Sequence, residues 1–387
     1  MLKVITASTT EIDEPEDALA EILKQIDVKN GLLANAVGIV TCYYEFIVTG
    51  VLEELRKNLP FEVIGCTALG SATNNGYSME QLSLTVLTSD EIRFATSISP
   101  EISKGNTDAP LQEAWRQGRA KLPGDPGLII AFAPIMSDIS GDYMLRKLDE
   151  ICGGLPIFGT LSNDSSPNFQ ESRTFLNGEV HQGKIALLQL YGPVKPRFFV
   201  SSVSIKNIHH QKALVTESDG YFIKKVNNLT FIDYLASIGV RKETLDTLTT
   251  LPFMVDYGDG TPPVALAIYS ILPEGALCGG EIPSGAGITF TEIDYNSVMD
   301  TAADALGQAL DYAEKNGANG ILAIPCMTRS LMIMPNSEDE MLKTFDAIGR
   351  KLPFMLFYSG GEICPLYNKE GVAVNRFHNY TYTLVVL

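Results

Sequence analysis

The sequence predicts an α+β fold in which mixed, largely antiparallel sheets are flanked by helices. Helical and strand patterns of hydrophobic residues alternate along the 387 residues, and a strand–helix–strand–strand unit recurs. The last strands of these units alternate strictly between apolar and polar residues. This period-two pattern favours antiparallel strands and distinguishes the chain from a doubly wound parallel domain.

The recurring unit consists of an apolar strand, a helix, a Leu-Pro pair and a second strand. Pro60 and Pro156 mark two copies that lie 96 residues apart, and Pro353 marks another 197 residues further on, close to two such periods. Leu251-Pro252-Phe253 is a weak candidate for the missing copy. Self-similarity at a fixed period indicates internal duplication, although helix–Pro–strand junctions also occur in ordinary α/β proteins.

The elements of the first unit follow from local patterns. Residues 2–7 predict a strand, and Asp13 with Glu16 has capping-box spacing for the helix that follows. Residues 36–42 predict a buried strand. Residues 46–57 predict a helix that ends before Pro60.

The closing strands have one apolar and one polar face. Leu82, Leu84 and Val86 alternate with hydroxyl residues, and residues 380–384 repeat this pattern. We expect the polar side of these antiparallel strands to be solvated or to line a cavity.

The second half begins with a change of pattern. After the strands around residues 198–205, Thr230 and Asp233 predict a capped helix, and residues 297–315 predict a long helix that Gly317 ends. We expect an N-terminal domain of residues 1–215 and a C-terminal domain of residues 216–387. Since no low-complexity linker separates them, the two should pack tightly.

Charge and cysteine content restrict the function. The net charge is −17, from 46 acidic and 29 basic residues, which argues against nucleic acid and anionic membranes as partners. The six cysteines are scattered, with no Cys-x-x-Cys pair and no metal-ligand spacing, so we expect no metal and no cofactor. No signal peptide or apolar membrane span is evident, which predicts a cytoplasmic protein with reduced cysteines.

Two turns after predicted strands are candidate binding sites. Gly65, Cys66 and Thr67 begin the first turn, whose backbone amides could bind an anionic group; the alternative is a tight structural connection. Asn163 and Asp164 occupy the same place in the second unit. They could bind a ligand amine or hydroxyl, or satisfy their own backbone as turn formers.

Two further candidates lie near the C-terminus. Arg329 could hold a carboxylate in a bidentate fork, or form a structural ion pair. Ser359 and Gly361 belong to a glycine-rich turn that permits close backbone approach, and Glu362 could accept a ligand ammonium. The alternative for this turn is a tight bend with a solvated carboxylate.

Catalytic signatures are missing from the sequence. It contains no Gly-x-Ser-x-Gly elbow, and nothing in the spacing pairs a cysteine with one of the four histidines. We therefore predict a protein that is not an enzyme, with a cysteine-dependent enzyme as the least favoured alternative.

Several motifs together resemble the FIST family. Gly65-Cys66-Thr67-Ala68-Leu69-Gly70 resembles the Gly-Cys-Ser/Thr-x-x-Gly turn of the FIST N-terminal domain. The FIST C-terminal domain has a Cys-x-x-Arg, a Phe-Tyr-Ser-x-Gly-Glu and a His-Asn-x-Thr motif. These are similar to Cys326 to Arg329, to residues 357–363 and to residues 377–381, which include Asn379. The turn departs from the family in having Gly70-Ser71 where many members have Gly-Glu, so an acidic contact is lost there.

The resemblance implies a sensory module of signal transduction that binds small ligands such as amino acids. The family occurs alone, in bacterial signalling proteins and in some eukaryotic F-box proteins, and it favours Cys66, Arg329, Glu362 and Asn379 as site or framework positions. We expect a stand-alone sensor of a small polar ligand that acts through a signalling partner. The rival hypothesis is a non-catalytic protein–protein scaffold.

Overall fold

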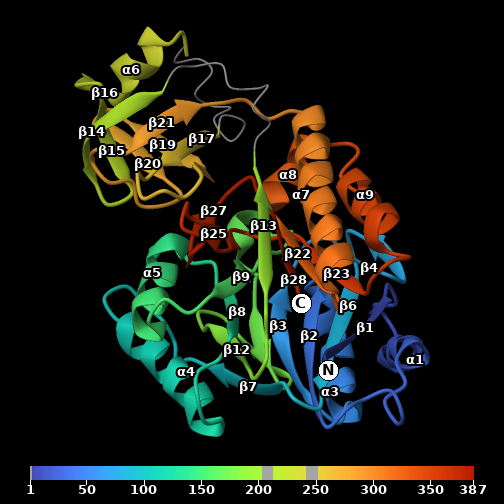
Figure 1. Cartoon of the computed structure of the whole chain (residues 1–387). Coiled ribbons are helices and arrows are strands. Elements are labelled where there is room, and N and C mark those ends of the chain that lie inside the picture. The colour runs from blue at the N-terminus through green and yellow to red at the C-terminus, as the bar shows by residue number, and fades with distance from the viewer. Residues whose placement is uncertain (1, 203–211, 241–251) are drawn as a thin grey trace.

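The computed structural model describes residues 2–202, 212–240 and 252–387. A body of three similar units is joined to a smaller β-rich lobe, which lies at the upper left of Figure 1. In the described residues, no helix is both long enough and apolar enough to cross a membrane.

The first sheet is built on the N-terminal unit. Its order is β1 (Leu2–Thr9), β6 (Leu82–Ser89), β2 (Asn35–Cys42), β3 (Glu62–Thr67), β10 (Thr174–Leu176) and β11 (Glu179–His181). Only the β2–β3 pair is parallel. The unit contains the helices α1 (Pro15–Gln25), α2 (Glu45–Val48) and α3 (Val51–Asn58).

The second sheet repeats this plan. Its order is β7 (Arg93–Ile98), β12 (Ala186–Tyr191), β8 (Leu128–Ala133), β9 (Ile157–Leu161), β24 (Glu362–Ile363) and β27 (Phe377–His378). Again one pair, β8–β9, is parallel. The helices α4 (Asp108–Lys121) and α5 (Gly141–Cys152) cover its outer side in Figure 1, and the short helix η1 (Pro167–Phe169) follows β9.

The third sheet contains the C-terminus. Its order is β13 (Arg197–Ser201), β28 (Tyr382–Val386), β22 (Ile321–Pro325), β23 (Phe354–Phe357), β4 (Ser71–Thr73) and β5 (Gly76–Ser78), with β22–β23 parallel. The helices of this unit are α7 (Tyr295–Asn316), α8 (Met327–Met332) and α9 (Asp339–Ile348).

The three units exchange segments in a ring. The chain that follows β3 completes the third sheet, the chain that follows β9 completes the first, and the chain that follows β23 completes the second. One backbone hydrogen bond repeats in all three units. The carbonyls of Cys42, Ala133 and Pro325 accept from the amides of Ala68, Ser162 and Ser359 at 2.9, 2.8 and 2.8 Å, respectively. The predicted internal repeat and the mixed α+β class are confirmed.

The lobe is inserted in the third unit, between β13 and α7. It contains α6 (Phe231–Ser237) and the strands β14 (Ala213–Asp219), β15 (Phe222–Val226), β16 (Leu229–Thr230), β17 (Phe253–Asp256), β18 (Val264–Leu266), β19 (Ile268–Leu272), β20 (Gly275–Cys278) and β21 (Gly287–Phe290). A two-stranded ribbon, β25 (Leu366–Tyr367) with β26 (Ala373–Val374), follows β24. Because the lobe is inserted in the third unit, Pro353 lies 197 residues after Pro156, about twice the 96 residues between Pro60 and Pro156.

The prediction that Leu251-Pro252-Phe253 marks a further copy of the repeated unit is wrong. Leu251 lies outside the described residues, and Phe253 begins β17, which pairs with β18 and β21 of the lobe in antiparallel fashion. The division at residue 215 stays a prediction. The two predicted halves share sheets, since β13 pairs with β28 and β9 with β24.

Most predicted elements appear at the expected places, including the Thr230 cap, which accepts from the Asp233 amide, and the long helix that Gly317 ends. The predicted capping box is wrong: Glu14 occupies the cap position of α1 without a side-chain bond, and Glu11 accepts from the amides of Asp13 and Glu14. The single helix at 46–57 is also wrong. Gly50, with φ of 89°, separates α2 from α3 because this left-handed conformation interrupts a right-handed helix.

The alternating strands are antiparallel, as predicted, but they do not expose a solvated face. Every residue of β6 and of β28 is buried. Several of their hydroxyl groups pair inside the protein instead: Ser83 lies 2.8 Å from the Ser71 hydroxyl, and Thr383 donates to the carbonyl of Ile324. Helices of the same unit cover the apolar side of each strand: α1 and α3 pack on β6, and α7 and α9 pack on β28.

Candidate functional site

Asn163 joins the three units at their common junction. The Asn163 amide donates to the carbonyl of Thr67 in the first unit at 3.2 Å, and the equivalent amide of Gly360 donates to Leu161 at 3.0 Å. The third junction has no such direct bond among the described residues. The fully buried Asn163 side chain bridges it, accepting from the Leu69 amide and donating to the Tyr358 carbonyl, each at 2.7 Å.

The turn after β3 is filled by protein contacts. A side chain at Gly65 would place its Cβ 1.7 Å from the Val40 carbonyl oxygen, so only glycine fits there. Cys66 is fully buried, and burial raises the pKa of its thiol. Thr67 exchanges backbone and hydroxyl bonds with Arg173.

The expected free amides are not found in this turn. The amide of Thr67 donates to Arg173, that of Ala68 to Cys42, that of Leu69 to Asn163 and that of Gly70 to Met79. An anionic ligand would therefore have to displace protein hydrogen bonds here.

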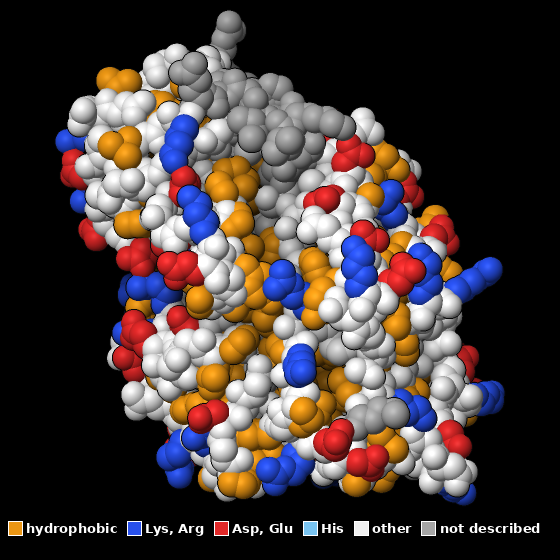
Figure 2. All heavy atoms as spheres, in the orientation of Figure 1, with side chains coloured by type: hydrophobic (Ala, Val, Ile, Leu, Met, Phe, Trp, Pro, Cys, Tyr) orange, Lys and Arg blue, Asp and Glu red, His pale blue; other side chains and the backbone are white. Residues whose placement is uncertain are grey.

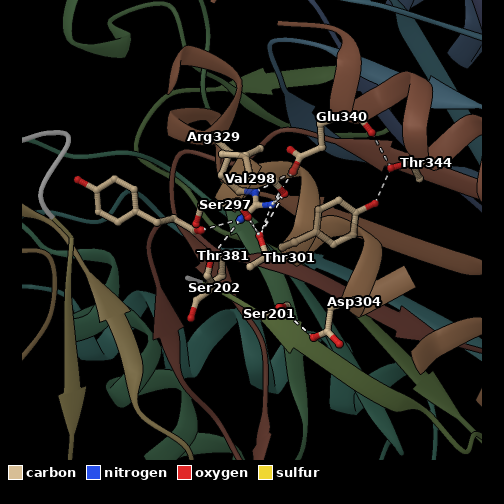
Figure 3. A network of polar contacts seen from close by, with 12 residues as sticks. Ser201, Ser202, Ser297, Val298, Thr301, Asp304, Arg329, Glu340, Thr344 and Thr381 are labelled. Atoms are coloured by element: carbon tan, nitrogen blue, oxygen red, sulfur yellow. Dashed lines mark hydrogen bonds and ion pairs between the residues drawn. The ribbon is translucent and has the colours of Figure 1, made fainter. Parts of the chain in front are cut away.

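Arg329 lies fully buried in a network of acceptors (Figure 3). Its Nε and Nη2 donate to Glu340 Oε1 at 2.9 and 2.6 Å, and Nη2 also donates to Val298 and Thr301. Its Nη1 donates to the carbonyls of Tyr380 and Ser202. All five N–H groups of the guanidinium thus have acceptors, which favours the structural ion pair that the sequence left open.

Glu362 is buried like Arg329, but one of its two carboxyl oxygens lacks a hydrogen-bond partner among the described residues. Its Oε2 accepts from the hydroxyl of Thr381 at 2.7 Å and from the Thr381 amide at 3.3 Å. Within the described residues, Oε1 accepts no hydrogen bond, and the side chain is fully buried. Burial raises the pKa of the Glu362 carboxyl to about 8, with the Thr381 and Cys326 side chains opposing the shift.

The glycine-rich turn positions this carboxyl. The Ser359 hydroxyl accepts from Thr160 at 2.8 Å and from the Gly361 amide at 2.9 Å. A Cβ at Gly361 would lie 2.4 Å from the Phe377 ring, so the turn can pack against β27 only with glycine. Glu362 then pairs with Thr160 on one side and His378 on the other.

The lobe reaches the same region through Asn379. The Asn379 amide donates to the Ala265 carbonyl and its Oδ1 accepts from the Ala267 amide, both at 3.0 Å. Tyr269 of β19 also lies there. Tyr269 as a whole is 58% exposed. Burial of its hydroxyl group raises the pKa of this group to about 12, and the nearby Cys326 and Glu362 add to the shift, while a hydrogen bond with Asn379 opposes it.

Polar contacts hold the lobe on the body elsewhere as well. Asp142, at the start of α5, accepts from the Glu281 amide at 2.9 Å, and Arg146 pairs with Glu281 at 2.7 Å. Arg376 pairs with Asp259. Figure 2 shows a hollow between the lobe and the α7 side of the body, with hydrophobic side chains along it.

Asp164 stands apart from the other candidates. It is 2% exposed, its Oδ1 accepts from the Ser166 amide, and its Oδ2 has no partner among the described residues. Among the described residues, no hydrogen bond or ion pair joins Asp164 to Arg329 or Glu362. No group of three or more potential metal ligands occurs in the described residues.

The structure therefore gathers Ser359, Gly361, Glu362 and Asn379 in one region. It adds Cys326 and Thr381, which belong to the motifs quoted from the sequence. It also adds Tyr269, which sequence reasoning missed because β19 has no motif and reaches the region only through docking of the lobe.

Comparison with known proteins agrees with these motifs. The FIST N domain model matches residues 36–229, and the FIST C domain model matches residues 231–365. No curated protein matches the sequence. Among solved structures, a cyanuric acid hydrolase from A. caulinodans is similar with a TM-score of 0.40 and 7% identity, over 100% of this chain and 99% of that chain.

A second cyanuric acid hydrolase, described as an evolutionary innovation by structural concatenation, gives a TM-score of 0.35 and 7% identity, over 100% of this chain and 98% of that one. At these scores, the likeness supports no conclusion about activity or ligand. The two domain models cover most of the sequence in the expected order, and the protein therefore belongs to the FIST family.

Proposed function

We propose that this protein is a sensor that binds a small polar ligand, such as an amino acid or an amine, beside Glu362 where the lobe meets the body. FIST domains are associated with signal transduction and small-ligand sensing. The observation that supports this site is the unpaired Oε1 of a fully buried carboxyl. Because an unsatisfied buried polar group costs about 1–3 kcal/mol, it calls for a functional explanation.

The composition of the site supports sensing. Cys326 and Glu362 come from the body, whereas Tyr269 comes from the lobe, so a ligand between them would contact both parts. Differential contact with two parts is what allows a ligand to shift their arrangement. The output would pass to a signalling partner, and the six free, buried cysteines are consistent with a cytoplasmic location.

A scaffold remains the second candidate. Leu331 in the last turn of α8 and Met334 just after this helix are 46% and 64% exposed, and the Met334 amide donates to the Leu331 carbonyl. Exposed apolar side chains of this kind can mark protein contacts. The cysteine-dependent enzyme is less well supported, because burial raises the pKa of each of the six thiols and so disfavours a reactive thiolate.

A thermal-shift screen of the full chain against amino acids, amines, nucleotides and organic acids tests the proposal. A ligand at 100 times its dissociation constant stabilises the folded state by about 2.7 kcal/mol. We expect a shift that Glu362→Gln and Tyr269→Ala abolish and that Glu370→Gln, in an exposed turn, leaves intact. A shift that survives both site variants would place the ligand elsewhere, and a flat screen would favour the scaffold.

A further inference from the structure

The two oxygens of the Glu362 carboxyl are not equivalent. Thr381 donates to Oε2 through both its hydroxyl and its amide. Oε1 has no N–H or O–H donor among the described residues, and the Cys326 thiol beside it is a weak donor. The oxygen that is open to a new partner is therefore Oε1.

Among the described residues, the groups around Glu362 include no cation that is free to bind a ligand anion. The described titratable and charged groups near it are the Cys326 and Cys364 thiols, the Tyr269 hydroxyl, His378 and Arg329, with the Tyr380 hydroxyl close to Cys326 and Tyr269. Arg329 uses every N–H on protein acceptors. Burial lowers the pKa of His378 to about 4, so its ring is neutral, and Nε2 contacts the Cys364 carbonyl.

A carboxylate brought into this region would thus be desolvated beside another carboxyl, with no free counter-charge from the described residues. That is the costly case for a buried ion. A protonated nitrogen would instead find one open acceptor, Oε1 of Glu362. Tyr269 of the lobe, which interacts electrostatically with Glu362, is 58% exposed.

We infer that the ligand is a small organic amine without a carboxylate, bound as an ammonium whose N–H donates to Oε1 of Glu362. This inference rests on the proposed function and narrows its ligand class. Glu362 is the group that ionises: the ammonium displaces the carboxyl proton to solvent, and the product is a buried ammonium–carboxylate pair. Since the pKa of Glu362 is about 8, binding at pH 7 releases close to one proton.

Two matched series test the ligand class. We would titrate the full chain by calorimetry with 3-methylbutylamine, leucine and 4-methylpentanoate, and with ethylamine, alanine and propionate. Each series keeps one carbon skeleton and changes only its charged groups. We expect at least one amine to bind ten times or more tightly than its amino acid, and the acids not to bind. Affinity should rise up to tenfold per pH unit between pH 6 and 8.

Proton release is the second readout. Repeating the amine titration in two buffers of different ionisation enthalpy should show about one proton released at pH 7, and Glu362→Gln should weaken binding at least tenfold. Tyr269→Ala should also weaken binding, and because its ring is exposed this variant tests the site even if Glu362→Gln fails to fold. Glu370→Gln is the matched control.

The outcomes separate the two proposals. Tighter binding of an amino acid, lost in Glu362→Gln, would overturn the amine class while leaving the sensor site in place. Amine binding without proton release would contradict the proposal that the ammonium displaces the carboxyl proton of Glu362. No binding by either series, together with a flat broad screen, would overturn the sensor proposal itself.

Discussion

Arg329 and Glu362 are both fully buried members of FIST motifs, yet their surroundings differ. Every N–H of Arg329 has an acceptor, and Glu340 neutralises its charge at 2.6 Å. Glu362 and Glu340 each have one oxygen that lacks a hydrogen-bond partner among the described residues, but of the two only the Glu340 carboxyl is paired with a cation. A satisfied buried charge fixes the positions of the elements around it, whereas an unsatisfied one leaves capacity for a ligand.

The two residues also differ in what they connect. Arg329 joins α8 to α7, to α9 and to the chain on both sides of the inserted lobe, through Val298, Glu340, Ser202 and Tyr380. Glu362 contacts Thr381 and otherwise faces thiols and a lobe phenol. The comparison predicts stability effects of very different size when the two charges are removed.

The largest effect should come from Arg329→Met. This change leaves the Glu340 carboxylate buried without its counter-charge, so we expect the free energy of unfolding to fall by about 3–5 kcal/mol. At pH 4.5, where the Glu362 carboxyl is protonated in the folded state, Glu362→Gln should change it by less than about 1 kcal/mol, because the amide oxygen can still accept from Thr381. Urea unfolding of both variants measures the difference.

The double variant Arg329→Met with Glu340→Leu is the control for the larger effect. Removing both charges should recover much of the lost stability, since burying an unpaired charge causes most of the penalty. Equal losses in Arg329→Met and Glu362→Gln would contradict the distinction between the two sites.

The next effect concerns the junction of the units. Asn163→Ala leaves the Leu69 N–H and the Tyr358 carbonyl buried without partners, at a cost of about 1–3 kcal/mol for each group. Asn163→Asp keeps the acceptor for Leu69 but loses the donor to Tyr358, so it should be destabilised as well. Asn316→Ala on the exposed end of α7 is the control, and comparable loss in all three would argue against a special role for the junction.

A third prediction concerns how the contribution of Glu362 to stability depends on pH. The pKa of Glu362 is raised from 4.5 to about 8, so the folded state binds more protons than the unfolded state between these values. Its contribution to stability is therefore present below pH 4.5 and is lost as the pH rises to 8, by up to about 1.4 kcal/mol per pH unit. Glu362→Gln should remove this fall.

His378 must be considered in the same experiment. Its pKa is lowered to about 4, so it acts with the opposite sign and its stabilisation is lost as the pH falls from 6.5 toward 4. The difference between wild type and Glu362→Gln, measured by urea unfolding at each pH, cancels this contribution. A pH-independent difference would mean that Glu362 is ionised in the folded protein at all these pH values.

The smallest effect should be at the contact between lobe and body. Arg146 and Glu281 form an ion pair whose side chains are 45% and 36% exposed, so Arg146→Ala should cost less than about 1 kcal/mol. Hydrogen exchange should increase locally in the lobe near Glu281, and added salt should reduce the difference from wild type. A global loss of stability would show that the lobe and body unfold as one unit through this pair.

Local patterns in the sequence were sufficient for the repeating units. The Leu-Pro spacing, the strand alternation and the cap at Thr230 depend on neighbours within a few residues, and all three appear in the structure. The motifs around Ser359 and Asn379 also converge as the family resemblance implies. One failure, the helix divided at Gly50, occurred where the backbone conformation of a single residue decided the outcome. Another, the expected solvated face of β6 and β28, arose because these strands are buried in the tertiary structure.

The sequence by itself thus determined the class of fold, the three units and the candidate residues. Only the tertiary structure decided that the units exchange strands in a ring, that the N–H groups of Arg329 all have acceptors and that Tyr269 of the lobe interacts electrostatically with Glu362. The physical reason is that hydrogen-bond partners here come from distant parts of the chain: Arg329 binds acceptors 11 to 127 residues away, and Asn163 bridges to Tyr358 over 195. Which buried group remains unpaired therefore depends on how the whole chain packs.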